Sequence, residues 1–160
     1  MKLALYSLIA STIFWGTVLG GFAYSHLVFF PVYLSELPRS AVVVNGPYGL
    51  TDGRFWALVH PFLILSLMVT LIANRKSLPR RNLVLVSCAI YFVGLVVTML
   101  YFFPELMAFQ ASADSSVSPA EWLVRGTMWQ RLSWIRGGMM YVGFLPLVLA
   151  LTKTDPVEGP

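Results

Sequence analysis

The sequence predicts an all-α integral membrane protein: one domain, residues 1–160, folded as an up-down-up-down bundle of four helices. Two observations lead to this prediction. Of the 160 residues, 58% are hydrophobic and only 11% are charged, whereas soluble domains carry about a quarter charged residues. The apolar residues also gather in four runs, each near the roughly 20 residues that cross a bilayer as a helix. The predicted spans are residues 3–33, 55–74, 82–103 and about 126–152.

The distribution of positive charge predicts how these spans are oriented. Under a four-span topology six basic residues fall on one side, namely Lys2, Arg75, Lys76, Arg80, Arg81 and Lys153. Only three fall in the opposite loops, namely Arg39, Arg54 and Arg125. Because Lys and Arg concentrate in short cytoplasmic loops, we expect a multi-pass protein of the inner (cytoplasmic) membrane with both termini in the cytoplasm. The net charge of +4 then indicates topology and contact with membrane lipid, not a nucleic-acid partner.

The first predicted helix, residues 3–33, is expected to be retained and not removed as a signal peptide. Its apolar run continues past the small residues GFA through HLVFFPVYL, which a cleaved leader would not do. Gly16 and Gly20 form a small-xxx-small pair that lets helices approach closely in lipid. Packing inside the bundle is the favoured role for this pair, and a dimer face is the alternative. Pro31 and Pro38 are expected to end the helix on the external side.

The first external connection and the second helix follow. The β-branched run and Asn-Gly of AVVVNGPYG predict a short extended segment and a turn. Thr51 or Asp52 is expected to cap the second helix. The third helix, which ends near Pro104, holds the only cysteine, Cys88, for which a packing role is expected.

The fourth helix has the clearest start signal in the chain. SPAE predicts a capping box with Ser118 at the N-cap, Pro119 at the first helical position and Glu121 three residues after the cap. A helix from there to Thr152 would be ~50 Å long, longer than the ~30 Å hydrocarbon core. Its first turns are therefore expected to project above the membrane or lie along it, and Pro146 is a candidate kink. The tail TDPVEGP is expected to be disordered.

Ionisable side chains inside a membrane bundle are functional candidates because their burial is costly. The predicted spans place five of them within roughly the outer 12 Å, namely His26, His60, Glu105, Arg131 and Arg136. A single polar pocket in the external half of the bundle is the economical explanation.

The two arginines in this set cannot both face the bundle centre. Arg131 and Arg136 are five residues apart, which turns them about 140° from each other on a helix. Because Gly137 and Gly138 leave space beside it, Arg136 is predicted to face inward, neutralised by Glu105 or by an anionic ligand. Arg131 is predicted to reach the rim. The alternative is that both side chains extend to lipid headgroups.

The histidines leave the question of a cofactor open. His26, His60 and Glu105 are candidate metal ligands, in a two-histidine, one-carboxylate iron site. The two histidines are also candidates for binding a haem. Neither arrangement has a local motif, and a lone histidine in a membrane helix is more often a hydrogen-bonded packing residue.

Three segments carry a resemblance to a known family. GGFAYSHLVFFPVYLSELP, LVVTMLYFFPELMAF and WQRLSWIRGGMMYVGFLPLVLAL resemble the anthrone-oxygenase-like family of small four-helix membrane proteins. Pro31, Pro104, Trp129 and Arg136 match positions that recur in it. The resemblance implies the four-helix fold, a polar site near the outer helix ends and an oxygenase-like or oxidoreductase activity.

Two functional hypotheses follow. In the first, the protein acts on a hydrophobic, quinone-like or polycyclic substrate that enters from lipid. Its candidate catalytic residues are Arg136, His26, His60 and Glu105, with Arg136 stabilising an anionic oxygen and a histidine moving protons. Its candidate substrate-binding residues are Trp129, Trp134, Tyr101 and Arg131, the aromatic ones stacking on a ring. In the second hypothesis the chain is a non-catalytic accessory subunit of a larger membrane complex. A cavity beneath Arg136 would favour the first, and an open Gly16–Gly20 face without a cavity the second.

Overall fold

The computed structural model describes residues 2–50 and 52–153, and the regular structure in these ranges is helical throughout. The elements are α1 (Lys2–Tyr24), η1 (Ser25–Phe29), α2 (Phe30–Tyr33), η2 (Arg39–Val43), α3 (Gly53–Ala73), α4 (Leu78–Val97), η3 (Thr98–Phe102), α5 (Phe103–Gln110), η4 (Ser112–Asp114) and α6 (Pro119–Leu151). The elements η1 and η3 are single π-helical turns within longer helices, whereas η2 and η4 are 3₁₀ turns. All four predicted helices are therefore present.

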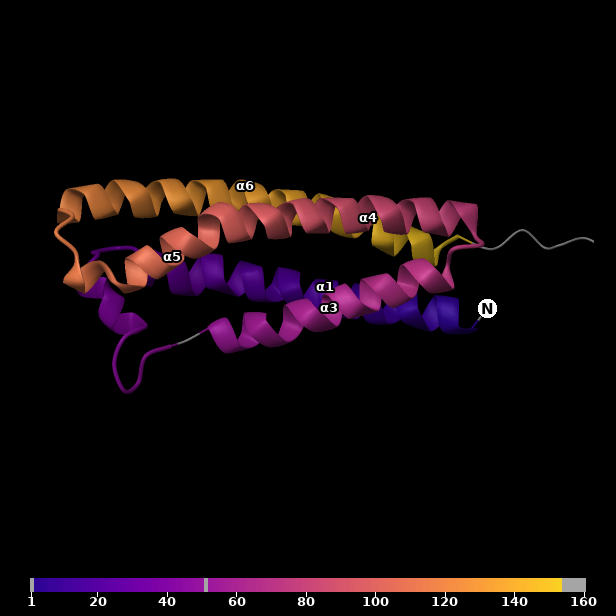
Figure 1. Cartoon of the computed structure of the whole chain (residues 1–160), viewed down its shortest axis with the longest axis horizontal. Helices are drawn as coiled ribbons and strands as arrows, with labels where there is room; N and C mark the ends of the chain where they lie inside the picture. Colours follow the sequence, from indigo (N-terminus) through magenta and orange to yellow (C-terminus); the bar gives the residue numbers. More distant parts are fainter. Residues whose placement is uncertain (1, 51, 154–160) are drawn as a thin grey trace, which may run out of the picture.

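Within the described ranges, four helical stretches are long and apolar enough to cross a membrane: Lys2–Tyr33, Gly53–Ala73, Leu78–Gln110 and Pro119–Leu151. The third extends beyond its predicted end at residue 103, because Pro104 lies in the first turn of α5 and does not stop the helix. The four stretches lie side by side along the long axis of the molecule (Figure 1). α1 packs against α3 and α6, and α4 packs against α6 and α3. The two long connections lie at one end of the molecule, called the loop end from here on (Figure 1).

The predicted capping signals have mixed outcomes. Ser118 caps α6, and its hydroxyl oxygen accepts a hydrogen bond of 3.2 Å from the backbone N–H of Glu121. α6 then continues as one α-helix past Pro146. Asp52 holds the N-cap position of α3 but makes no capping bond, because its carboxylate accepts a hydrogen bond from the Trp56 indole at 2.8 Å. Thr51 and the tail TDPVEGP lie outside the described residues.

The first loop is not extended, contrary to the prediction from AVVV. Residues 39–43 form the 3₁₀ turn η2, in which Ala41 is buried. The Ser40 hydroxyl holds the turn by donating to the carbonyl oxygen of Tyr33 at 2.7 Å. Tertiary contact therefore overrides the preference of β-branched residues for strands. The predicted turn at Asn-Gly is present, with Gly46 at φ 101°, where glycine is the favoured residue.

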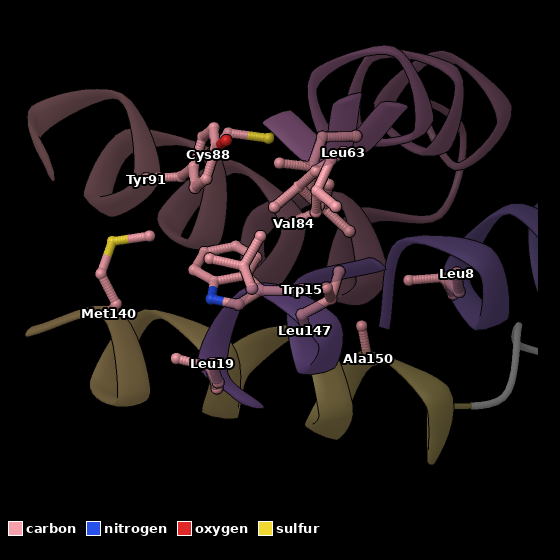
Figure 2. Packing of buried hydrophobic residues seen from close by; sticks show 13 residues of the cluster. Leu8, Trp15, Leu19, Leu63, Val84, Cys88, Tyr91, Met140, Leu147 and Ala150 are labelled. Atoms are coloured by element: carbon pink, nitrogen blue, oxygen red, sulfur yellow. The ribbon is translucent and has the colours of Figure 1, made fainter. Parts of the chain in front are cut away.

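Two apolar clusters hold the helices together. The first fills the half of the molecule away from the loop end, where Trp15 of α1 lies against Leu147 of α6 and Val84 of α4 (Figure 2). The second, built around Trp122, Trp129 and Phe109, lies at the loop end. Cys88 belongs to the first cluster, in agreement with its predicted packing role.

Gly16 and Gly20 do not mediate packing within the bundle, so the favoured prediction for this pair was wrong. A methyl group added at either position would meet nothing within 4 Å. The close approach occurs instead at Gly21 and Gly143, where an added methyl carbon would lie 2.5 Å from Phe55 and 2.6 Å from Ile90. The face that carries Gly16 and Gly20 is open.

Candidate ligand-binding site

A cavity of about 620 Å³ lies between the two apolar clusters. This volume is in the range of ~300–1,000 Å³ that holds small molecules in proteins. Val18 and Tyr91 of the first cluster border it, as do Phe30 and Trp129 of the second. Most of the lining is apolar, and the polar side chains within it include His26, His60, Tyr91, Thr98 and Arg136.

Two π-helical turns bring polar residues to this cavity. In η1 the N–H of Phe30 bonds the carbonyl oxygen of Ser25, and in η3 the N–H of Phe103 bonds that of Thr98. Each turn is followed, one residue later, by a proline, Pro31 or Pro104, which lacks an N–H and whose ring crowds the carbonyl four residues earlier. Widening the preceding turn relieves this crowding. Such π turns often lie at functional sites, and here they carry His26 and Thr98.

Arg136 is the cation of the cavity, and the groups that hold it are neutral. Its Nη1 donates to the hydroxyl of Thr98 at 2.6 Å, and its Nη2 donates to that of Ser133 at 3.0 Å. The guanidinium carbon lies 4.2 Å from the centre of the Phe102 ring, within reach of a cation–π interaction. Arg136 is therefore held in one place by two hydrogen bonds and a ring face.

The hydrogen-bond network around Arg136 has a direction. His26 Nδ1 lies 3.0 Å from the carbonyl oxygen of Phe22, which only accepts, so Nδ1 carries the proton. In the neutral ring Nε2 then accepts from the Ser133 hydroxyl, 2.8 Å away. The Thr98 hydroxyl likewise donates to the Gly94 carbonyl oxygen at 2.6 Å. The Ser133 and Thr98 hydroxyls thus donate their hydrogens to His26 and Gly94, and their oxygen lone pairs accept hydrogen bonds from Arg136.

A second polar pair always leaves one donor free. His60 Nδ1 and the Tyr91 hydroxyl are 2.6 Å apart, and either atom can donate. If Tyr91 donates, the neutral imidazole carries its proton on Nε2; if Nδ1 donates, the tyrosine O–H is free. Both residues line the cavity, so this pair offers a hydrogen-bond donor in either tautomer. Trp56 stacks on the His60 ring at a centroid distance of 5.5 Å.

Glu105 is not part of this site, which corrects the prediction that it neutralises Arg136. Its carboxylate pairs with Arg125, with Nη2 of the arginine 2.9 Å and 3.0 Å from the two carboxylate oxygens. Arg125 in turn lies 4.4 Å from the centre of the Trp122 ring. The pairing joins α5 to α6 outside the cavity lining.

The three candidate metal ligands His26, His60 and Glu105 therefore do not converge. Within the part of the chain that the structure describes, no group of three or more His, Cys, Asp or Glu side chains could hold a metal ion. Both ring nitrogens of His26 are engaged, by Phe22 and Ser133. Haem ligation through His26 would require breaking one of these hydrogen bonds, so this histidine fits a positioning role better than an axial ligand.

The structure separates the predicted substrate-binding residues. Trp129 lines the cavity, and its indole N–H donates to the Phe102 carbonyl oxygen at 3.0 Å. Trp134, 42% exposed, contacts the His26 ring edge to face at 5.0 Å but lies outside the lining, as does Tyr101. Arg131 is exposed, as predicted.

Sequence reasoning missed Thr98, Ser133 and Tyr91, although the chain carries a signal for the first two. SHLVFFP at 25–31 and TMLYFFP at 98–104 share four residues and a hydroxyl at the first position, 73 residues apart (98 − 25). The same offset relates Trp56 and His60 to Trp129 and Ser133 (129 − 56 and 133 − 60). The site thus draws on matching positions of two helix pairs.

Comparison of the chain with known protein-family models, with curated proteins and with solved structures finds no match. The resemblance to anthrone-oxygenase-like proteins stays a prediction, and the proposals below depend on the geometry of this chain.

Proposed function

We propose that the protein is a multi-pass membrane protein whose cavity binds a lipophilic small molecule, quinone-like or polycyclic. The observation that carries this proposal is an apolar cavity of about 620 Å³ in which a firmly held arginine supplies hydrogen bonds. Ligand sites of this kind combine apolar walls with a few placed polar groups. In the proposed topology the four long helices span the bilayer in alternating directions, with the termini in the cytoplasm and the loop end outside.

The apolar surroundings of the cavity support entry of the ligand from lipid. Several lining residues are also exposed on the outside of the molecule, among them Pro61 of α3, Met99 of η3 and Phe103 and Met107 of α5. These side chains come from the two helical stretches that diverge toward the loop end in Figure 1. A lipophilic molecule dissolved in the bilayer would reach the cavity between them.

The polar groups suit a ligand that carries oxygen atoms. Arg136 would donate hydrogen bonds to one oxygen, and the His60–Tyr91 pair would donate to another or exchange a proton with it. In an oxygenase-like or oxidoreductase reaction, which the family resemblance implies, Arg136 would stabilise an anionic oxygen. Dioxygen or a second redox molecule would have to supply the oxidising equivalents, because these side chains do not.

Binding of 1,4-naphthoquinone to the purified protein in nanodiscs tests the proposal. Trp56 and Trp129 line the cavity, so bound quinone should quench tryptophan fluorescence with a saturable isotherm. Arg136→Leu should weaken binding roughly 10- to 100-fold, which corresponds to the ~1.5–3 kcal/mol of a hydrogen bond from a charged group. Arg131→Leu is the matched control on the same helix and should leave the affinity unchanged. Equal affinities in both variants, or no saturable binding, would contradict the proposal.

Arg136→Leu should also fold, which keeps this test informative. A buried carboxylate left without its partner costs ~3–5 kcal/mol, but Glu105 keeps Arg125. The variant leaves only the neutral hydroxyls of Thr98 and Ser133 to find other partners.

The second candidate function, an accessory subunit of a membrane complex, has one observation in its favour. The open face at Gly16 and Gly20 has room for a closely packed helix of another chain. Replacing both glycines with leucine should then dissociate a complex captured by cross-linking in membranes while leaving naphthoquinone binding intact. An unchanged cross-linking pattern would argue against this function.

A further inference from the structure

We infer that the ligand of this cavity is a lipophilic monoanion, with its negative charge on oxygen and placed at Arg136. The inference rests on the proposed function, because it specifies the molecule that the cavity binds. The ligand class comprises carboxylates and ionised hydroxyquinones with an apolar body.

The first step is the missing counter-ion. Among the described residues Arg136 has no carboxylate partner: Glu105 is held by Arg125, and Glu36 pairs with Arg39. An acidic residue of the lining, Asp52, accepts a hydrogen bond from the Trp56 indole. The guanidinium keeps its charge when buried, so Arg136 itself lacks a paired counter-ion, and Asp52, the other charged side chain of the described lining, forms no ion pair with it.

The second step is the surroundings of that charge. Arg136 is held in a largely apolar cavity between two apolar clusters, where a charge interacts more strongly than in water. A neutral ligand would displace water from the guanidinium without replacing its role as a counter-ion. An anionic oxygen neutralises the charge and forms charge-assisted hydrogen bonds, which are stronger than those between neutral groups.

The third step is the number and position of the donors. Two of the five N–H groups of the guanidinium are used, by Thr98 and Ser133. Three remain for a ligand, and the His60–Tyr91 pair adds one more in either tautomer. The described lining contains one Lys or Arg side chain, that of Arg136. One cation with several donors suits a single negative charge shared by two oxygens, and the apolar walls suit a hydrocarbon or ring body.

Matched pairs of probes separate charge from shape. The first pair is 2-naphthoic acid and its methyl ester. The second is 2-hydroxy-1,4-naphthoquinone, ionised at neutral pH, and its neutral 2-methoxy ether. Binding to the protein in phosphatidylcholine nanodiscs is measured by equilibrium dialysis, with empty nanodiscs subtracting partition into lipid. At least one anion should bind roughly 10- to 100-fold more tightly than its neutral partner, and which pair shows the difference identifies the carboxylate or the hydroxyquinone.

The variants assign this preference to Arg136. Arg136→Gln keeps hydrogen-bond donors but removes the charge, so it should reduce the anion-to-neutral ratio to about one. Arg131→Gln should leave the ratio unchanged. The comparison of probes on the unmodified protein needs no variant, so it stands even where Arg136→Gln fails to fold.

The outcomes distinguish this inference from the proposed function. If the neutral members bind as tightly as the anions, the inference is overturned and the proposal of a lipophile-binding cavity stands. If neither member of either pair binds above the empty nanodiscs, both are overturned. A preference for the anion that persists in Arg136→Gln would also overturn the assignment, because the charge would then be recognised elsewhere.

Discussion

Replacing Gly137 with alanine should displace the Phe22 ring and, through it, the His26 ring that stacks on it. An added methyl carbon would lie against the Phe22 ring, with even the third-nearest ring atom at 2.9 Å, inside the closest approach that real side chains show. Phe22 is buried, and its ring stacks on His26 at a centroid distance of 3.8 Å. The ring lines the cavity, so the space open to the displaced ring includes the ligand site. The substitution should therefore reduce both stability and ligand affinity.

Gly138 is the matched control for this change, because a methyl group added there meets nothing within 4 Å. Both substitutions gain the ~1 kcal/mol by which alanine favours a helix over glycine, so this gain cancels between them. The remaining difference is the overpacking cost at Gly137, typically ~1–3 kcal/mol. At about 2–4 °C per kcal/mol for a chain of this length, Gly137→Ala should melt roughly 2–12 °C below Gly138→Ala.

Cys88 supplies the assay, because it is the only cysteine and it is buried. A dye that becomes fluorescent on reaction with thiols should report unfolding of the detergent-solubilised protein during heating. Adding Phe22→Leu to Gly137→Ala removes the clashing ring atoms and should recover part of the lost melting temperature. Equal melting temperatures for Gly137→Ala and Gly138→Ala would refute the packing argument.

Three further predictions concern topology and the polar groups. In a cysteine-free background, Lys76→Cys and Ser115→Cys should label from opposite sides of the membrane, and labelling from the same side would refute the four-span topology. Glu105→Gln should lower stability by about 1 kcal/mol, as for a partly exposed ion pair, and should leave the naphthoquinone affinity unchanged. A large loss of affinity would show that Glu105 does take part in ligand binding. Tyr91→Phe should keep the fold but weaken naphthoquinone binding several-fold, because it removes the hydroxyl that positions the His60 ring and a neutral hydrogen bond contributes ~0.5–1.5 kcal/mol; an unchanged isotherm would show that the Tyr91 hydroxyl does not contribute to the site.

Local sequence rules predicted what depends on neighbours along one helix. The N-cap at Ser118 and the divergence of Arg131 from Arg136 both follow from helical spacing, and the structure contains both. The presence of four apolar helices follows from run length alone.

Pairings between helices were beyond those rules. Glu105 and Arg125 lie 20 residues apart, on either side of a loop, and no spacing rule selects this arginine over Arg136. The Ser133 hydroxyl is 107 residues from its His26 partner. The 3₁₀ turn at Ala41 was missed because its burial depends on the packing of the loop end, which strand propensity does not describe.

The arrangement of charges explains why two arginines of α6 have different partners. Arg125 takes the carboxylate of α5, in a salt bridge that leaves about a quarter of each side chain exposed (30% and 24%). Arg136 receives only hydroxyls whose hydrogens already point to Gly94 and His26. Hydroxyl partners orient a guanidinium without cancelling its charge, whereas a carboxylate would do both. The network from Phe22 through His26 and Ser133 therefore fixes the position of Arg136 and leaves its charge available to a ligand, which is the condition that selective binding of an anion requires.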